Sequence, residues 1–495
     1  MRWIVLLQSV RSLPLHPSKP PSSKAWHFSL LLLCLSFASV AGARSRPHYG
    51  GAIRVEVDGD PMQRPSGMAR RLVLDGLTRL DEQGQTRPSL AEHWTSENNN
   101  HRWQFRLRTG VVFHDGKPLT SIAVAASLTD SCRIAACPWS GVHAVGQSLI
   151  ITSDSAIPEL PAMLAEDRFR IQAVAGDETD ASPLPGSILI GTGPFRLVSS
   201  QSKPVVRLEA NVVRLEANDE CWQGRPFLDA IELIPRKASH EFSMDMNSTA
   251  FNKGIDLVAL EPGEVRQATQ RRLTLATQPA VSLLALQVRE ESLNLQLRAA
   301  LSLAIDRSAI YQVIFQKQGE VTASLLPASV SGYSFLFPTE RDLSHAQTQR
   351  GGLTPQPLTI AAEDSEPVQL AAARIALNLH DAGFNVRALP PLHDGRIANA
   401  DLTLRTIPLS SGQTEVALDA MLRIFGQTAT VPANNPNDPT AAYKIERTFL
   451  DQHTVIPILY LPRTWAVSSR IRDLRLTFDG TPDLADASLN AEDAP

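Results

Sequence analysis

The sequence of 495 residues lacks the short motifs that carry common enzyme chemistry. It has no Gly-x-Ser-x-Gly turn for a serine nucleophile, no His-Glu-x-x-His zinc helix and no phosphate-binding P-loop. Its 12 histidines are scattered, and none is four residues from another on an expected helix. These absences favour a binding protein over an enzyme. A hydrolase is kept as an alternative, because catalytic residues can assemble from distant parts of a chain.

One adjacent pair, His114 and Asp115, has the composition of a catalytic dyad. Gly116 follows it directly, and Asp-Gly is a frequent turn sequence. We interpret these three residues as a turn.

The chain also lacks an excess of positive charge. It has 47 lysines and arginines against 51 acidic residues, a net charge of −4, and no basic stripe with interleaved aromatic residues. Such a stripe is the usual sign of nucleic-acid binding, so we predict no nucleic-acid partner.

Cysteine is scarce, with four in the whole chain and no Cys-x-x-Cys pair. His143 is the only imidazole near Cys132 and Cys137, so the sequence predicts no metal site and no cofactor. The five-residue separation fits either a small disulfide loop or two buried thiols, and Cys221 has no remaining partner in the former case.

A single long apolar run lies near the N-terminus. Residues 28–38, FSLLLLCLSFA, follow Lys19 and Lys24 and precede Ala-Gly-Ala at 41–43. This order predicts a secretory signal peptide over residues 1–43 and a periplasmic protein, with a membrane anchor as the alternative. Leu33 stands where a lipoprotein signal needs a small residue, and the long leader leaves the true start codon open.

Beyond residue 47, strand and helix patterns alternate. Residues 101–108 alternate apolar with arginine-rich positions, as a half-exposed strand does, and Thr120 is placed to cap a helix that follows it. Residues 292–315 have the apolar spacing of one amphipathic helix. Residues 358–389 read as strand, helix and strand. The pattern indicates an α/β protein of two or three domains.

Five segments spread over residues 50–480 are similar to the ordered motifs of one family. They are GLTRLDEQGQTRPSLAEHWTSENNNHRWQFRLRTGVVFHDGKPLT (76–120), GTGPFRL (191–197), EANDECWQGRPFLDAIELI (216–234), LRAALSLAIDRSAI (297–310) and VIPILYLPRTWAV (455–467). In them the chain resembles the extracellular solute-binding proteins, family 5, of peptide- and nickel-type ABC transporters. Cys221 stands where that family usually has tyrosine.

The resemblance implies a periplasmic binding protein-like, two-lobed α/β fold of type II, cluster C-like, with an inserted extra domain. Domain I would comprise residues 48–68, 189–277 and 465–495, domain II residues 69–188, and domain III residues 278–464. The implied function is capture of a peptide-like or other small solute between the lobes and its delivery, by a monomer, to an ABC transporter permease. A binding-fold protein that serves as a sensor or scaffold is the alternative.

The resemblance also bears on a repeated heptad, VVRLEANVVRLEAN, at 205–218. Strand side chains alternate with a period of two, so an insertion of seven residues exchanges the two faces. The family has one strand here, and the copy at 212–218 adjoins the next motif. We therefore expect the second copy to be the strand and the first, 205–211, to be a looped-out duplication. One long ribbon containing both copies is the alternative.

The resemblance points to candidate ligand contacts at three places. Gln63, Arg64 and Ser66 would face the cleft, with Arg64 offering a planar fork for carboxylates, unless it is a solvated surface residue. Trp139 lies near an aromatic cleft position of the family, although a core tryptophan is the interpretation that we favour.

The third place is the segment TIPLS at 406–410. There Ile407 and Ser410 replace the Trp and Asp by which peptide binders hold the peptide ammonium group. Because a buried ammonium without a partner is costly, we expect no capture of free peptide N-termini. Arg405 would favour an anionic ligand.

Overall fold

The computed structural model describes eleven stretches of the chain. They are residues 47–57, 61–62, 67–134, 137–173, 189–197, 212–236, 254–333, 336–352, 356–392, 396–427 and 440–490. The predicted signal peptide and the first copy of the heptad lie outside these residues. None of the described helices is long and apolar enough to cross a membrane.

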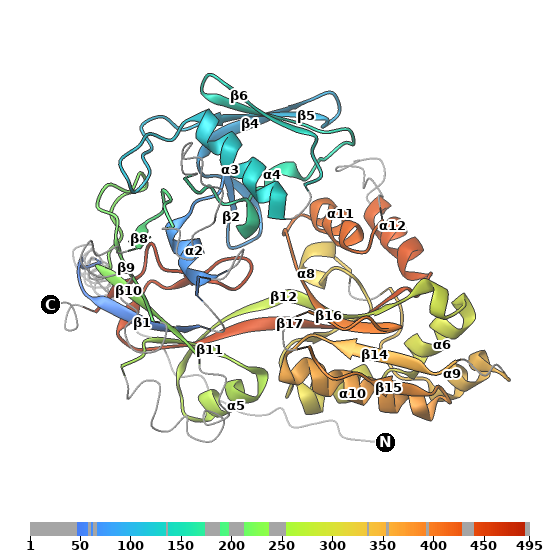
Figure 1. The fold of residues 1–495 in the computed structure, drawn as a ribbon. Coiled ribbons are helices and arrows are strands. Elements are labelled where there is room, and N and C mark those ends of the chain that lie inside the picture. The colour runs from blue at the N-terminus through green and yellow to red at the C-terminus, as the bar shows by residue number, and fades with distance from the viewer. Residues whose placement is uncertain are drawn as a thin grey trace, which may run out of the picture. The chain divides into compact units, whose positions relative to one another are not determined.

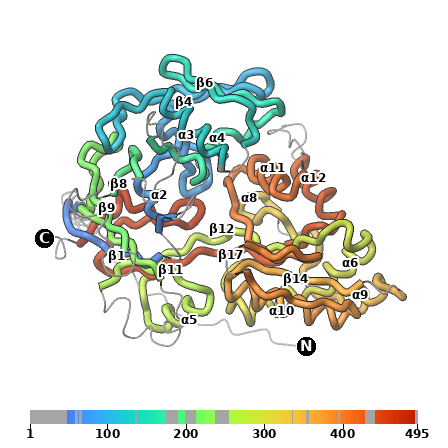
Figure 2. Tube along the Cα trace, in the orientation of Figure 1, coloured from blue at the N-terminus to red at the C-terminus, as the bar shows by residue number. Residues whose placement is uncertain are grey.

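The largest element is a mixed sheet in the order β15-β14-β16-β12-β17-β11-β1-β10-β9-β8, with β13 paired to β17. Its strands are β1 (Ala52–Val57), β8 (Phe195–Leu197), β9 (Val213–Ala217), β10 (Ala230–Pro235), β11 (Leu257–Leu260), β12 (Thr274–Val288), β13 (Glu320–Val321), β14 (Leu358–Ala362), β15 (Val386–Ala388), β16 (Leu402–Pro408) and β17 (Val455–Val467). Figure 2 shows the two longest strands, β12 and β17, running side by side.

The pairing of β12 with β17 is interrupted once between Gln278 and Ser282, and again by a one-residue shift further along. Within the first interruption Ala280 has a φ of 54°, a left-handed conformation that is uncommon outside glycine and asparagine. On one side of it β17 also pairs with β11, and on the other side β12 also pairs with β16. One sheet therefore connects two differently packed halves.

Helices cover both faces of the half that contains β12, β14 and β16 (Figure 1). Along β12, Leu284 and Leu286 belong to one core and Leu283 and Ala285 to another, as the period of two requires. The first core includes α6 (Leu295–Ala304), α9 (Leu343–Arg350) and α10 (Glu366–Asp381), and the second includes α11 (Thr414–Ile424) and α12 (Ala441–Leu450), near the short α8 (Ala328–Ser331).

The other half packs β1, β9, β10 and β11 against α2 (Met68–Val73). The helix α5 (Pro262–Gln270) follows β11 and has a capping box of Glu261 and Glu264. In this half the second copy of the heptad forms β9, which lies between β8 and β10. The expectation that residues 212–218 supply the strand is confirmed.

A separate core surrounds a four-stranded antiparallel sheet in the order β4-β5-β7-β6. Its elements, with a preceding hairpin, are β2 (Thr78–Leu80), β3 (Thr86–Pro88), β4 (Ala91–Glu97), β5 (Arg102–Leu107), α3 (Ser121–Ile134), β6 (Gly141–Val145), β7 (Ser148–Thr152), α4 (Leu160–Met163) and the 3₁₀ turn η1 (Asp167–Phe169). Thr120 Oγ1 accepts a hydrogen bond from Ala123 N at 3.2 Å, so the predicted cap is confirmed. A disulfide joins Cys132 and Cys137, and Cys221 is a buried free thiol.

The prediction of one helix over 292–315 is wrong in its continuity. The 3₁₀ turn η3 (Glu290–Ser292) precedes α6, which ends at Ala304, and α7 (Arg307–Ala309) and the π-helical turn η4 (Ile310–Ile314) follow. Asp306 causes the break, because its side chain accepts a hydrogen bond from Ala309 N at 2.8 Å and caps a new helix. Apolar spacing alone did not reveal this cap.

Two short antiparallel pairings occupy the last described stretch of residues. They join β18 (Ile471–Arg472) to β21 (Ser488–Leu489) and β19 (Arg475–Leu476) to β20 (Pro482–Asp483). The turn between β19 and β20 carries Asp479, which belongs to the site described next.

Candidate functional site

A cavity of about 1820 Å³ lies between the α2 and β2–β3 region on one side and β16 and α11 on the other. Its floor includes residues of β17 and of the 475–486 segment. Within the described residues, this wall carries ten carboxylates and seven arginines, and no lysine or histidine. A ligand here would meet a dense field of charge from both sides.

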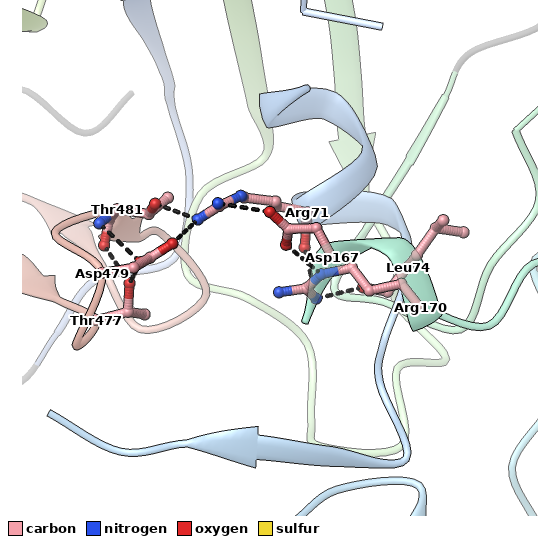
Figure 3. A network of polar contacts seen from close by, with 7 residues as sticks. All are labelled: Arg71, Leu74, Asp167, Arg170, Thr477, Asp479 and Thr481. Carbon is pink, nitrogen blue, oxygen red and sulfur yellow. Dashed lines mark hydrogen bonds and ion pairs between the residues drawn. The ribbon is translucent and has the colours of Figure 1, made fainter. Parts of the chain in front are cut away.

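Arg71 is the centre of the most extensive charged network on the wall (Figure 3). It projects from α2 and forms an ion pair at 2.5 Å with Asp167 of η1 and a second with Asp479. Arg71 also donates a hydrogen bond to Thr481. Arg170 holds the other oxygen of Asp167 at 2.9 Å and donates to the Leu74 carbonyl at 2.8 Å. The network ties three segments distant in sequence.

Within this network Asp479 is stabilised as an anion. Burial disfavours the charge of Asp479, but Arg71 and a hydrogen bond from Thr477 outweigh it and hold the pKa of Asp479 well below its usual range.

A second arginine, Arg423, also lies between two carboxylates, but here the pKa of one carboxylate is raised. Its Nε is 2.8 Å from Glu159 Oε1 and 2.8 Å from Asp419 Oδ2. The Glu159 side chain, just before α4, is only 2% exposed. Burial and the neighbouring carboxylate of Asp419 raise the pKa of Glu159 to about 8.

Close to this cluster, two loops on opposite sides of the cavity meet through their backbones. Gly412 N donates to the Gly84 carbonyl at 2.9 Å, and Gln413 Nε2 donates to Gln85 Oε1 at 3.0 Å. A Cβ on Gly412 would overlap the carbonyl oxygen of Gln83, so only glycine fits the contact. The two sides of the cavity are thus in direct contact, as in a closed binding cleft.

Two of the sequence motifs donate hydrogen bonds to one buried carboxylate, Asp75. Asp75 Oδ2 accepts hydrogen bonds from Thr192 Oγ1 and from Trp222 Nε1, both at 2.9 Å. Nearby, His114 Nε2 is 3.0 Å from the Gly193 carbonyl, and Gly116 has a φ of 80° within a tight turn. His114 and Asp115 are therefore turn residues, as predicted, and the motifs hold the fold together around Asp75.

Among the predicted ligand contacts that the structure describes, Ser410 lines the cavity, and Trp139 and Arg405 do not. Ser410 lies on the cavity wall, and its buried Oγ has no hydrogen-bond partner among the described residues. Gln63, Arg64 and Ser66 lie outside the described residues.

Trp139 and Arg405 are placed away from the cavity wall. Trp139 is 8% exposed and packs on Phe169 with ring centroids 4.8 Å apart, inside the core of the four-stranded sheet. The Arg405 guanidinium lies 5.6 Å from the ring centroid of Phe425. Neither residue lines the cavity, and their role in ligand binding stays a prediction.

Sequence reasoning missed the charged residues that the structure brings together. Arg71, Glu159 and Arg423 come from three segments without a shared motif. One signal was present in α11, where Asp419 is buried among apolar neighbours and stands four residues before Arg423. A carboxylate in an apolar stretch needs a partner, and the partner lies on the next helical turn. Within the described residues no group of three or more His, Cys, Asp or Glu side chains is arranged to hold a metal ion.

Comparison with known proteins decides the family. The profile of "Bacterial extracellular solute-binding proteins, family 5 Middle" matches residues 85–393. The chain belongs to family 5 of the bacterial extracellular solute-binding proteins. The resemblance seen in the sequence motifs is therefore confirmed.

Two curated relatives match parts of the chain. The uncharacterized protein YhjP of Bacillus subtilis is 31% identical over 189 residues, which are 35% of this chain and 29% of YhjP. The nickel-binding protein NikA of Staphylococcus aureus is 24% identical over 247 residues, 49% of this chain and 48% of NikA. The matched region thus spans less than half the length of either relative.

A solved structure extends the likeness to the whole fold. The binding protein AgaA of A. tumefaciens R10, in complex with agropinic acid, has a TM-score of 0.71 at 17% identity. The alignment covers 89% of this chain and 99% of AgaA. The predicted two-lobed, periplasmic binding protein-like α/β fold is confirmed.

Proposed function

We propose that this family 5 protein is the periplasmic substrate-binding component of an ABC import system. It captures a small solute, peptide-like or of another class, in the cavity and delivers it to a membrane permease. The observation that carries the proposal is the 1820 Å³ cavity whose opposite sides touch at Gly84 and Gly412. A chamber of this size, bounded by two separately packed halves, suits capture by closure.

The interruption of the β12–β17 ladder supports a hinge at that place. It falls at Gln278–Ser282, next to the predicted boundaries between domains I and III at residues 277/278 and 464/465. We therefore keep the predicted domains, with residues 69–188 as the inserted domain II and residues 1–43 as the signal peptide. Closure about this hinge would exclude water from the bound solute.

Relatives of this fold bind different solutes, so the ligand is found by a screen. Thermal unfolding of residues 44–495 would be measured against peptides, sugars, opines and metal chelates. A ligand at about 100 times its Kd should add about 2.7 kcal/mol, which is visible as a rise of several degrees in Tm. Ser282 lines the cavity, so Ser282→Trp should remove the rise, whereas Ser96→Trp on the exposed face of β4 should keep it.

Two outcomes would contradict the proposal. One is the absence of any Tm rise across the screen, and the other is a rise that Ser282→Trp leaves unchanged. Delivery to a permease is tested in cells, where deletion of the gene should abolish uptake of the solute that the screen identifies. Continued uptake would favour a role as a sensor.

A further inference from the structure

Most arginines on the cavity wall are already neutralised by carboxylates. Five of the seven have a carboxylate oxygen within 4.0 Å, namely Arg71, Arg168, Arg170, Arg423 and Arg475. The other two, Arg79 and Arg463, are exposed. With ten carboxylates on the same described wall, the cavity has an excess of negative charge. Coulomb energy therefore favours a cationic group over an anionic one inside it.

One carboxylate is held in place without a counter-ion. Glu363 follows β14 at its carboxyl end, and its backbone N donates to the Leu404 carbonyl at 3.2 Å. Glu363 Oε2 accepts a hydrogen bond from Thr406 Oγ1 at 2.6 Å. Among the described residues no arginine, lysine or histidine lies within ion-pair distance of Glu363. A single neutral hydroxyl fixes its orientation and leaves its charge available.

Ser410 adds an unused polar group to the same wall. Thr406 and Ser410 both line the cavity on the segment formed by β16 and the residues after it. Ser410 Oγ is buried without a hydrogen-bond partner in the described part of the chain. A buried hydroxyl without a partner costs about 1–3 kcal/mol, which a ligand group that hydrogen-bonds to it would recover.

We propose that Glu363, oriented by Thr406, is the anionic anchor for a cationic end of the ligand, an ammonium or a guanidinium group. Ser410 Oγ serves as a further acceptor for the same group. This inference rests on the proposed function and names its ligand class. It differs from two expectations from the sequence, because it places the anionic anchor at Glu363 instead of position 410, and it names a cationic ligand group where Arg405 would favour an anionic one.

The proposal is tested with pairs of probes that differ in one charge. L-arginine is compared with L-citrulline, and tri-alanine with N-acetyl-tri-alanine, by calorimetric titration of residues 44–495. We expect the cationic member of at least one pair to bind about ten- to hundredfold more tightly, as hydrogen bonds to charged groups require. Glu363→Gln should remove this preference and leave the affinity of the neutral member unchanged.

Two further variants separate anchoring from general electrostatics and from misfolding. Asp486→Asn removes an exposed carboxylate from the same cavity wall and should change the preference by less than about threefold. Thr406→Val should weaken the preference partly, because Glu363 keeps its charge and loses its orientation. The unfolding midpoint of each variant without probe verifies the fold.

Three results would overturn the proposal. These are equal binding within each pair, no binding of any cationic probe, or a preference that survives Glu363→Gln. If neutral or anionic solutes still bind in the wider screen, only the inference about Glu363 fails and the solute-binding function stands. If no solute of any class binds, the proposed function itself fails.

Discussion

Two clusters in this protein each place one arginine between two carboxylates, and they show opposite pKa shifts. Next to Arg71, the guanidinium and a hydrogen bond from Thr477 hold the pKa of Asp479 well below its usual range. Next to Arg423, burial of Glu159 beside Asp419 raises the pKa of Glu159 to about 8. The Arg71 cluster has a second cation, Arg170, and a hydroxyl donor, whereas Glu159 is 2% exposed beside another carboxylate, so the surroundings of each arginine set the pKa values.

The clusters also differ in what they connect. Arg71 links α2 and η1 to the turn at Asp479, which lies on the floor of the cavity. Arg423 of α11 reaches Glu159, next to α4, across the cavity. The Arg71 cluster therefore ties one side of the cavity to its floor, whereas the Arg423 cluster joins the two sides.

The largest expected effect comes from removing Arg71, the arginine at the centre of the first cluster. Arg71→Met removes the shared counter-ion of Asp167 and Asp479, whose side chains are 13% and 35% exposed, and this should lower the free energy of unfolding by about 1–3 kcal/mol at pH 7. Urea unfolding measures it. Arg87→Met is the matched control, because Arg87 is 55% exposed in its pair with Asp81 and should cost about 0–1 kcal/mol. Equal costs for the two variants would contradict a structural role of the Arg71 cluster.

A methyl group added at Gly412, between the two sides of the cavity, should alter the Arg423 cluster and leave the Arg71 cluster unchanged. Gly412→Ala forces apart the contact with Gln83 and Gly84, so the radius of gyration from X-ray scattering should increase. The pKa of Glu159 should then fall toward its ordinary value, while Asp479 stays ionised. Gly352→Ala, at an open position, serves as control and should leave the scattering unchanged. An unaltered radius for Gly412→Ala would show that the loops do not limit opening.

Stability should depend on pH in opposite directions for the two clusters. Because the folded pKa of Glu159 is raised to about 8, its contribution is complete below about pH 4.5 and is lost as the pH rises to 8. Burial also raises the pKa of Glu446 to about 7, so the pH dependence of the wild type alone reports both groups. The contribution of Glu159 is therefore measured as the difference in Tm between the wild type and Glu159→Gln. That difference in Tm should grow from pH 5 to pH 8.5, with the variant less sensitive. A parallel decline of both proteins would exclude Glu159 as the source.

The smallest effect is expected at low pH, from Asp479 of the Arg71 cluster. The pKa of Asp479 lies below its usual range, so its contribution is present at neutral pH and is lost as the pH falls below about 4. Asp479→Asn should therefore unfold at nearly the same acid pH with a flatter transition below pH 4. If the unfolding transition of the variant below pH 4 is as steep as that of the wild type, other carboxylates dominate acid unfolding.

The sequence predicted local structure well because strand and helix signals are local. The alternation at Trp103, Phe105 and Leu107 and the cap at Thr120 depend on neighbours within a few residues. The break at Asp306 was missed, since an Asp inside an apolar pattern reads equally well as a solvated helical residue.

The candidate site was harder to predict because its contacts are long-range. Glu159 and Arg423 are 264 positions apart in the chain, and no local pattern relates them. The motif comparison did place Ser410 at the cavity wall, but it assigned the missing negative charge to that position alone. Glu363 could be recognised only when β14 and β16 lay side by side in the sheet.

The position of β17 has a consequence for how this chain acquires its structure. β17 is paired on both sides, to β11 and β12, and its residues 455–467 follow those of every other described strand of the main sheet. Both halves of that sheet are therefore completed by the strand that is synthesised last among them. Such late, non-local pairing makes formation of the main sheet slow. The four-stranded sheet contains no part of β17, so its core can form earlier in synthesis.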